Sequence, residues 1–138
     1  MSENLHLPRP KADSEKITIN LGFVDLGNID LLVREGFYSN RSDLIRTAIR
    51  NQIEKHAEAT QRSQVRSELD LGIRHFSRAD LEAAEASGAM ININVLGLAS
   101  IADDVSAELA LSTIQSVNVL GAFHASMKVK TALADRIC

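Results

Sequence analysis

The sequence predicts an α+β fold in two parts, a strand-helix-helix segment followed by a small α/β domain. Three observations support this prediction. Polar and apolar residues alternate over residues 15–21, which is typical of a half-buried strand. Two stretches with apolar residues at helical spacing follow before residue 62. Beyond this point strand-like and short helical runs alternate, and similar segments recur after about 24 residues.

The chain has 138 residues, of which 45% are hydrophobic and 24% are charged, so it has room for one ordinary domain or two small ones. We expect a flexible arm at residues 1–14, a strand-helix-helix domain at 15–62 and a C-terminal α/β domain at 63–138. No apolar run reaches the length of about 18 residues that a membrane span needs. The N-terminus lacks the apolar core of a signal peptide, so we expect a cytoplasmic protein.

The charge is distributed unevenly between the two parts. Residues 1–62 carry nine basic and nine acidic side chains and sum to zero, whereas residues 63–138 carry six and nine and hold the whole net charge of −3. No global positive field is present. Any contact with DNA therefore has to come from local clustering of basic and polar groups.

The strand predicted at residues 16–21 has two chemically different faces. Its apolar face consists of Ile17, Ile19 and Leu21, and its polar face consists of Lys16, Thr18 and Asn20. The first helix is expected to start from Asp25 as its N-cap and to run to about Glu35. Gly36 then occupies the position of a left-handed C-terminal cap.

The second helix is expected over residues 41 to about 58. Asn40 is a favourable N-cap, and Asp43 completes a capping box in its acidic form. Apolar residues then recur at helical spacing on one face. The polar residues 58–66 are interpreted as a helix tail or a linker.

A strand and two helices over about 45 residues cannot close a hydrophobic core alone. The economical solution is an intertwined homodimer, in which two copies of the strand pair antiparallel above four helices. The dimer core would consist of Ile17, Ile19, Leu21, Ile29, Leu32, Leu44, Ile45, Ala48 and Ile49. The polar face of the two-stranded ribbon would then remain exposed.

Such a ribbon fits the major groove of double-stranded DNA. Lys16 can donate to guanine, Asn20 can bond adenine in a bidentate manner, and Thr18 can contact a base edge or a thymine methyl. The start of the second helix, at Asn40, Arg41 and Ser42, offers backbone N–H groups, a cation and a hydroxyl to a phosphate. The ribbon would read bases while the helix starts bind flanking phosphates.

These residues resemble a known family. The stretch KITINLGF…IDLLVREGFYSNRSDLIRTAIRNQI is similar to the ribbon-helix-helix family of MetJ/Arc/CopG-like repressors, above all in NRSDLIRTAI. The resemblance covers roughly residues 15–58. It implies a ribbon-helix-helix homodimer that regulates transcription as a repressor. Its base-contacting positions fall on Lys16, Thr18 and Asn20, and its phosphate-contacting helix start falls on Asn40, Arg41 and Ser42. The segment GFVDLGN departs from the pattern, because it is apolar and carries two glycines.

The C-terminal part contains a sequence repeat. NVLG occurs at Asn94 and again at Asn118, and a weaker third copy places Gly72 about 25 residues before Gly97. Each copy is interpreted as a strand, a turn and a short helix, with the helices opening at Ser77, Ser106 and Ser126. A compact α/β domain without true repeats is the alternative interpretation.

Three roles are open for the C-terminal part. It can be an oligomerisation module that makes the dimer a tetramer on adjacent half-sites. It can bind a toxin, in which case the protein is an antitoxin that represses its own operon. It can also be a small-molecule sensor, although no ligand-specific residues are evident.

Other classes are not supported by any motif. There is no Ser/His/Asp order, no glycine-rich phosphate loop and no HExxH, so we expect neither an enzyme nor a cofactor. Asp103 and Asp104 are interpreted as a turn before a helix. His75, His124 and Cys138 are far apart in the sequence, so we expect no metal site.

Overall fold

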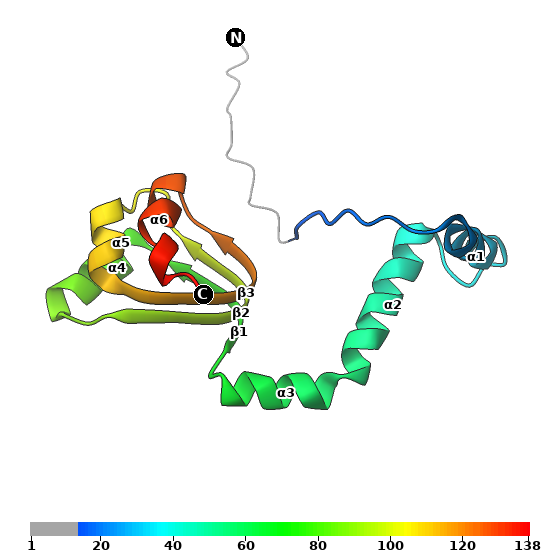
Figure 1. Cartoon of the computed structure of the whole chain (residues 1–138), viewed down its shortest axis with the longest axis horizontal. Coiled ribbons are helices and arrows are strands. Elements are labelled where there is room, and N and C mark those ends of the chain that lie inside the picture. The colour runs from blue at the N-terminus through cyan, green and yellow to red at the C-terminus, as the bar shows by residue number, and fades with distance from the viewer. Residues whose placement is uncertain (1–13) are drawn as a thin grey trace, which may run out of the picture. The chain divides into compact units, whose positions relative to one another are not determined.

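The computed structural model describes residues 14–138 and has the mixed α+β composition that the sequence predicts (Figure 1). The predicted arm, residues 1–14, lies outside the described residues except for Ser14. The chain divides into two compact units, the first ending at Ile53 and the second comprising Glu54–Cys138. Each unit is described by itself below, and the predicted domain boundary at residue 62 stays a prediction.

The first unit contains two helices, α1 (Phe23–Arg34) and most of α2 (Arg41–Lys55). The prediction that Asp25 is the N-cap of α1 was wrong, because the N-cap is Gly22, three residues earlier. Asp25 instead lies in the first turn, where a carboxylate is favourable beside the positive end of the helix dipole. The left-handed cap at Gly36 is confirmed by its φ of 85°.

The second predicted helix is present but is interrupted. It forms as α2, and after His56 the chain continues as α3 (Ala57–Arg66). The polar stretch 58–66 therefore belongs to a helix of its own, rather than to a linker. Its Ala, Glu, Gln and Arg residues are good helix formers, which explains a helix without an apolar stripe.

The second unit alternates strands and helices after α3, as the sequence predicts. The elements are β1 (Asp70–Phe76), α4 (Arg78–Ser87), β2 (Ile91–Ile101), α5 (Ala107–Thr113), β3 (Ile114–His124), α6 (Met127–Ala132) and the 3₁₀ helix η1 (Ala134–Arg136). The three strands are parallel and follow one another in the order β1-β2-β3. Parallel neighbours of this kind need a crossover connection, and each crossover here contains a short helix.

The strand register aligns the residues that the sequence repeat aligns. Gly72 pairs with Gly97, and Gly97 pairs with Gly121. All three glycines have φ between 117° and 138°. A Cβ on Gly97 would lie 2.1 Å from the carbonyl oxygen of Gly72, and one on Gly121 would lie 2.1 Å from that of Gly97. At Gly97 and Gly121 the backbones approach too closely for any side chain, whereas Gly72 has open space around it and is constrained only by its positive φ.

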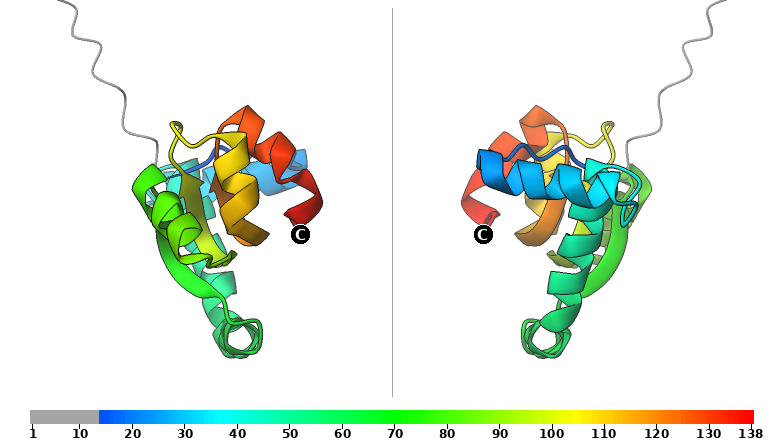
Figure 2. Two further views of the ribbon diagram at one scale, coloured as in Figure 1. Left: turned by 90° about the vertical axis from the view of Figure 1, so that its left-hand side faces the viewer. Right: turned by 90° about the vertical axis from the view of Figure 1, so that its right-hand side faces the viewer.

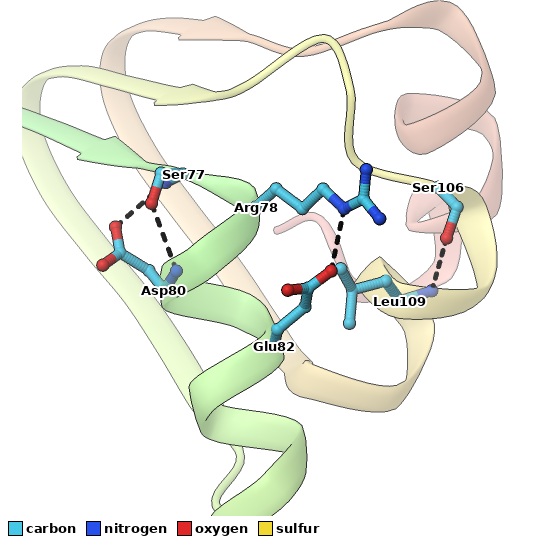
Figure 3. A network of polar contacts seen from close by, with 6 residues as sticks. All are labelled: Ser77, Arg78, Asp80, Glu82, Ser106 and Leu109. Atoms are coloured by element: carbon cyan, nitrogen blue, oxygen red, sulfur yellow. Dashed lines mark hydrogen bonds and ion pairs between the residues drawn. The ribbon is translucent and has the colours of Figure 1, made fainter.

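Serine caps open the two crossover helices, α4 and α5, and the helix α6 after the last strand, as predicted. Ser77 and Asp80 form a reciprocal capping box, in which the Asp80 N–H donates to Ser77 Oγ at 3.1 Å (Figure 3). Ser106 accepts from the N–H of Leu109, and Ser126 accepts from the N–H of Val129. The hydrogen bonds from Ser77 lower the pKa of the Asp80 carboxyl below its ordinary value. Each cap satisfies a backbone donor that the helix itself cannot satisfy.

The hydrophobic core of the second unit lies between the sheet and its helices. Figure 2 shows α4, α5 and α6 side by side on one face of the sheet, with α5 in the middle (left view). The buried apolar residues are Phe76, Leu81, Ile93, Val95, Ala99, Ile101, Val105, Ala110, Ile114, Val117, Val129 and Leu133. The crossover helices α4 and α5 lie on the same side of the sheet because successive crossovers share the same hand, and α6 packs beside α5.

Within residues 14–138, no helix has both the length and the hydropathy needed to cross a bilayer.

Candidate DNA-binding surface

The segment expected to read DNA bases is exposed and unpaired in the single chain. Residues 15–22 form neither helix nor strand, and the side chains of Lys16, Thr18 and Asn20 are all exposed. A strand needs a neighbour for its hydrogen bonds, and the expected neighbour is the same segment of a second copy. The strand at 16–21 and the roles of its polar residues therefore stay predictions.

The start of α2 has the predicted N-cap at Asn40, whereas the predicted capping-box carboxylate of Asp43 bonds a different residue. Asn40 Oδ1 accepts a hydrogen bond from the N–H of Asp43 at 2.8 Å. The Asp43 carboxylate turns back and accepts from the N–H of Ser39 at 3.0 Å, one residue before the expected partner. The backbone N–H groups of Arg41 and Ser42 lie in the first turn and have no acceptor within the helix. They are the groups that a phosphate would meet.

Arg41, the predicted phosphate cation, already has a partner. Its Nε and Nη2 atoms donate to the two carboxylate oxygens of Asp30 in α1, each at 2.8 Å. This bidentate geometry is the strongest form of an arginine-carboxylate contact. The contact links the two helices of the first unit and compensates much of the Arg41 charge.

The ion pair also changes the acid-base properties of both groups. The hydrogen bond from Arg41 lowers the pKa of the Asp30 carboxyl, and the carboxylate in turn raises the pKa of Arg41. Asp30 therefore stays ionised at any pH at which the protein would bind DNA. The guanidinium of Arg41 therefore lies beside an ionised carboxylate, although both side chains are exposed to water.

The apolar side chains of the first unit have no cover in the single chain. Neither α1 nor α2 contains a buried residue. Ile17 is 83% exposed, Ile19 is 63% exposed and Ile49 is 53% exposed. All nine residues predicted for the dimer core are exposed or only half-buried. Exposed apolar surface of this extent favours association with a partner.

The sequence did not identify Asp30 as part of this surface. Asp30 lies 11 residues before Arg41 and in a different helix, so no helical spacing connects the two. Only the fold of the turn between α1 and α2 brings them together. The sequence offered one signal for Asp30, namely a single acid beside several apolar residues of α1. This signal does not specify which residue the acid contacts.

Comparison with known proteins identifies one family. A family model described as the ribbon-helix-helix transcriptional regulator family matches residues 12–130, which is most of the chain and extends well beyond the two helices. No curated protein and no solved structure matches the chain.

Proposed function

Because the chain belongs to the ribbon-helix-helix transcriptional regulator family, we propose that it is a sequence-specific repressor that binds double-stranded DNA as a homodimer. The observation that carries this proposal is that neither helix of the first unit contains a buried residue. Two copies of residues 15–53 would bury the exposed isoleucines and leucines against each other. Apolar surface of this extent drives association in water.

In this dimer the two segments at 16–21 pair as an antiparallel ribbon. Alternation along a strand then directs Ile17, Ile19 and Leu21 toward the helices. The opposite face presents Lys16, Thr18 and Asn20 from each copy, six side chains in all, to the base edges of the major groove. Asn20 is the most selective of them, because an amide can donate to and accept from one adenine at the same time.

The start of α2 supplies the contacts that orient the dimer on DNA. The free N–H groups of Arg41 and Ser42 attract a phosphate together with the helix dipole. The cap at Asn40 keeps this end of the helix formed. Two such helix starts, each with two phosphates, make about four contacts, for which the slope of log K against log salt is about −3.6.

The antitoxin alternative has weaker support than repression. Toxin-binding segments are often disordered until they bind. The second unit instead has twelve buried apolar residues and capped helices of its own. A folded second unit favours a regulator with a permanent C-terminal module.

The base-reading role is tested with Asn20→Ala. We expect the affinity for the specific operator, selected from a random duplex library, to fall by roughly 5- to 150-fold, the loss of about 1–3 kcal/mol typical of a bidentate base contact. Binding to a scrambled duplex should change little. Gel shifts on both duplexes measure the difference, and Asn51→Ala, which removes an exposed amide from α2, is the matched control. Equal losses on both duplexes would reject the base-reading role.

A further inference from the structure

The sheet of the second unit has one face that α4, α5 and α6 do not cover. Side chains alternate between the faces, so residues paired in register point the same way. Val95 and Val119 pair with each other and face the helices, where both join the core. Their neighbours Leu96 and Leu120 also pair, but neither belongs to that core. We call the side to which they point the open face.

The centre of the open face is apolar. One row across the three strands consists of Leu71, Leu96 and Leu120, and the next row consists of Ile73, Leu98 and Ala122. Leu71 is 71% exposed, Ile73 is 67% exposed and Leu120 is 54% exposed. Exposed leucines and isoleucines that are contiguous on a regular sheet mark an interaction surface rather than ordinary scatter.

The open face also lacks formal charge. The strand residues that point to it include no Asp, Glu, Lys or Arg, in a chain that is 24% charged. The opposite side of this unit is acidic, because a groove between α4 and α5 is lined by Glu82, Glu85, Asp104 and Glu108 with Arg78. The charges of the unit are thus concentrated on the helix side. Apart from the imidazoles of His75 and His124, the strand residues of the open face offer a basic or acidic partner no ionisable group to pair with.

Most polar residues of the open face pair with one another. Ser116 donates to Asn92 at 2.8 Å, and the Asn118 amide donates to Asn94 at 3.1 Å. At the other end of the strands, His75 and Ser100 share a hydrogen bond of 2.7 Å. Groups already paired within the face lose little when water is removed, which makes the whole face suitable for burial.

We propose that the open face packs against the open face of a second copy of this chain. Two stacked sheets would lie about 10 Å apart, with interdigitating leucines in the centre and helices on both outer sides. The face is self-complementary, as a two-fold interface must be, because an uncharged apolar surface matches itself. A second copy is also the partner that ribbon pairing would bring into its vicinity, and in this respect the inference rests on the proposed function.

The size of the face explains why a tethered copy is the suitable occupant. From the strand lengths of 7, 11 and 11 residues, the face measures roughly 450 Å² per copy, or about 900 Å² for the pair. This is slightly below the roughly 1,000 Å² expected of an independent interface. Association through the ribbon raises the effective concentration of the second face to the order of millimolar, where a contact this small can form.

The test places opposite charges at the centre of the face. Leu96 is the middle residue of β2, which is the central strand. It therefore lies near Leu96 of the second copy whether the two-fold axis runs along the strands or across them. Full-length Leu96→Asp and Leu96→Lys chains are co-expressed, purified together and treated with a carbodiimide, which joins a carboxylate to an amine only when they touch. We expect an amide link between the two position-96 side chains, identified by peptide mass spectrometry. Met127→Asp with Met127→Lys, at a site 79% exposed on α6, should give no link between the introduced groups.

A second measurement needs no variant and covers the case in which the charged chains do not fold. Hydroxyl-radical footprinting of the unmodified protein should show Leu71 and Ile73 oxidised several-fold less than Val65, although all three are more than 60% exposed in the single chain. Equal oxidation would overturn the proposal. The proposal would also be overturned if the Leu96→Asp and Leu96→Lys chains fold but form no amide link between their position-96 side chains. This includes the case in which a different partner occupies the face.

The two proposals fail separately. The Leu96 substitutions leave Lys16, Thr18 and Asn20 unchanged, so the same sample can be assayed for specific DNA binding. Specific binding without the position-96 link rejects only the pairing of the open faces. The link without specific binding rejects only the proposed function.

Discussion

At the residue scale, the contact between Arg41 and Asp30 would determine how much charge the start of α2 offers to DNA in the proposed complex. An arginine held by two hydrogen bonds of 2.8 Å from a carboxylate is not free to bind a phosphate at full strength. In the proposed complex, Asp30 would act as a positioning residue, because it holds the guanidinium beside the helix start and would reduce the affinity of that site for a phosphate.

This competition predicts that Asp30→Asn strengthens DNA binding. Releasing Arg41 should raise the affinity for every duplex alike and steepen the slope of log K against log salt by up to about 0.9 per released cation. Fluorescence anisotropy with specific and scrambled duplexes over a salt series measures both effects. The control is the same substitution in an Arg41→Ala background, where no gain is expected. An equal gain there would trace the effect to the lost negative charge alone.

The same pair sets a pH dependence at the acid end. Because Arg41 lowers the pKa of Asp30 in the folded chain, the pair contributes stability above the ordinary Asp pKa, and this stability is lost as the pH falls through the lowered value. The wild type should therefore be more stable than Asp30→Asn above that ordinary pKa, and acid titration of stability should show this difference disappear as the pH falls below it. Both side chains are exposed, so the difference is small.

At the element scale, the row of glycines controls how closely the three strands approach. Gly72 and Gly97 share a positive φ that other residues rarely adopt, but only Gly97 faces a backbone oxygen at 2.1 Å from its hypothetical Cβ. The two positions therefore separate backbone strain from steric overlap. Nothing lies within 4 Å of the corresponding point at Gly72, which is on the outer strand.

We expect Gly72→Ala to lower the free energy of unfolding by about 1–3 kcal/mol, the cost of an unfavourable φ. Gly97→Ala should cost clearly more, because strands β1 and β2 must also separate to admit the methyl group. Urea unfolding of the second unit, followed by circular dichroism, measures the two losses. Similar losses for both variants would mean that β1 and β2 separate at little cost, so that the steric overlap at position 97 does not contribute to the loss of stability.

The sequence was most informative where local chemistry alone determines the outcome. The serine caps, the cap at Gly36 and the alternation of strands with helices followed from short-range patterns and are confirmed. The start of α1 was placed too late, because Asp25 is as favourable in a first turn as at an N-cap. The helix α3 was not recognised, because helix propensity without an apolar stripe gives no periodic signal.

Contacts between elements were not predictable in the same way. The partner of Arg41 depends on how one turn folds, and no spacing in the sequence encodes it. The open face is a different case. Its alternating pattern in β2 is obscured because both faces of this central strand carry apolar residues, as in any parallel sheet buried on both sides. That pattern is itself consistent with a second layer on the open face.

At the scale of the whole molecule, the two units differ in how they acquire a core. The second unit buries twelve apolar residues by itself, whereas the helices of the first unit bury none. In the proposed dimer, folding of the first unit is inseparable from association. Its stability should accordingly depend on protein concentration, while that of the core in the second unit should depend on concentration much less.

Ile19→Asp tests this division, because it places a charge at the centre of the proposed ribbon. We expect loss of specific DNA binding and loss of the helical circular dichroism contributed by α1 and α2, while the amide protection of β2 and β3 persists in hydrogen exchange. Val65→Asp, at an exposed apolar position of α3 outside the proposed dimer core, should change neither property. In the wild type the melting temperature of the first unit should rise with protein concentration, and in Ile19→Asp this dependence should disappear. If Ile19→Asp kept both its helical signal and its DNA binding, the first unit would not be held together by the ribbon, and the dimeric repressor would have to be abandoned.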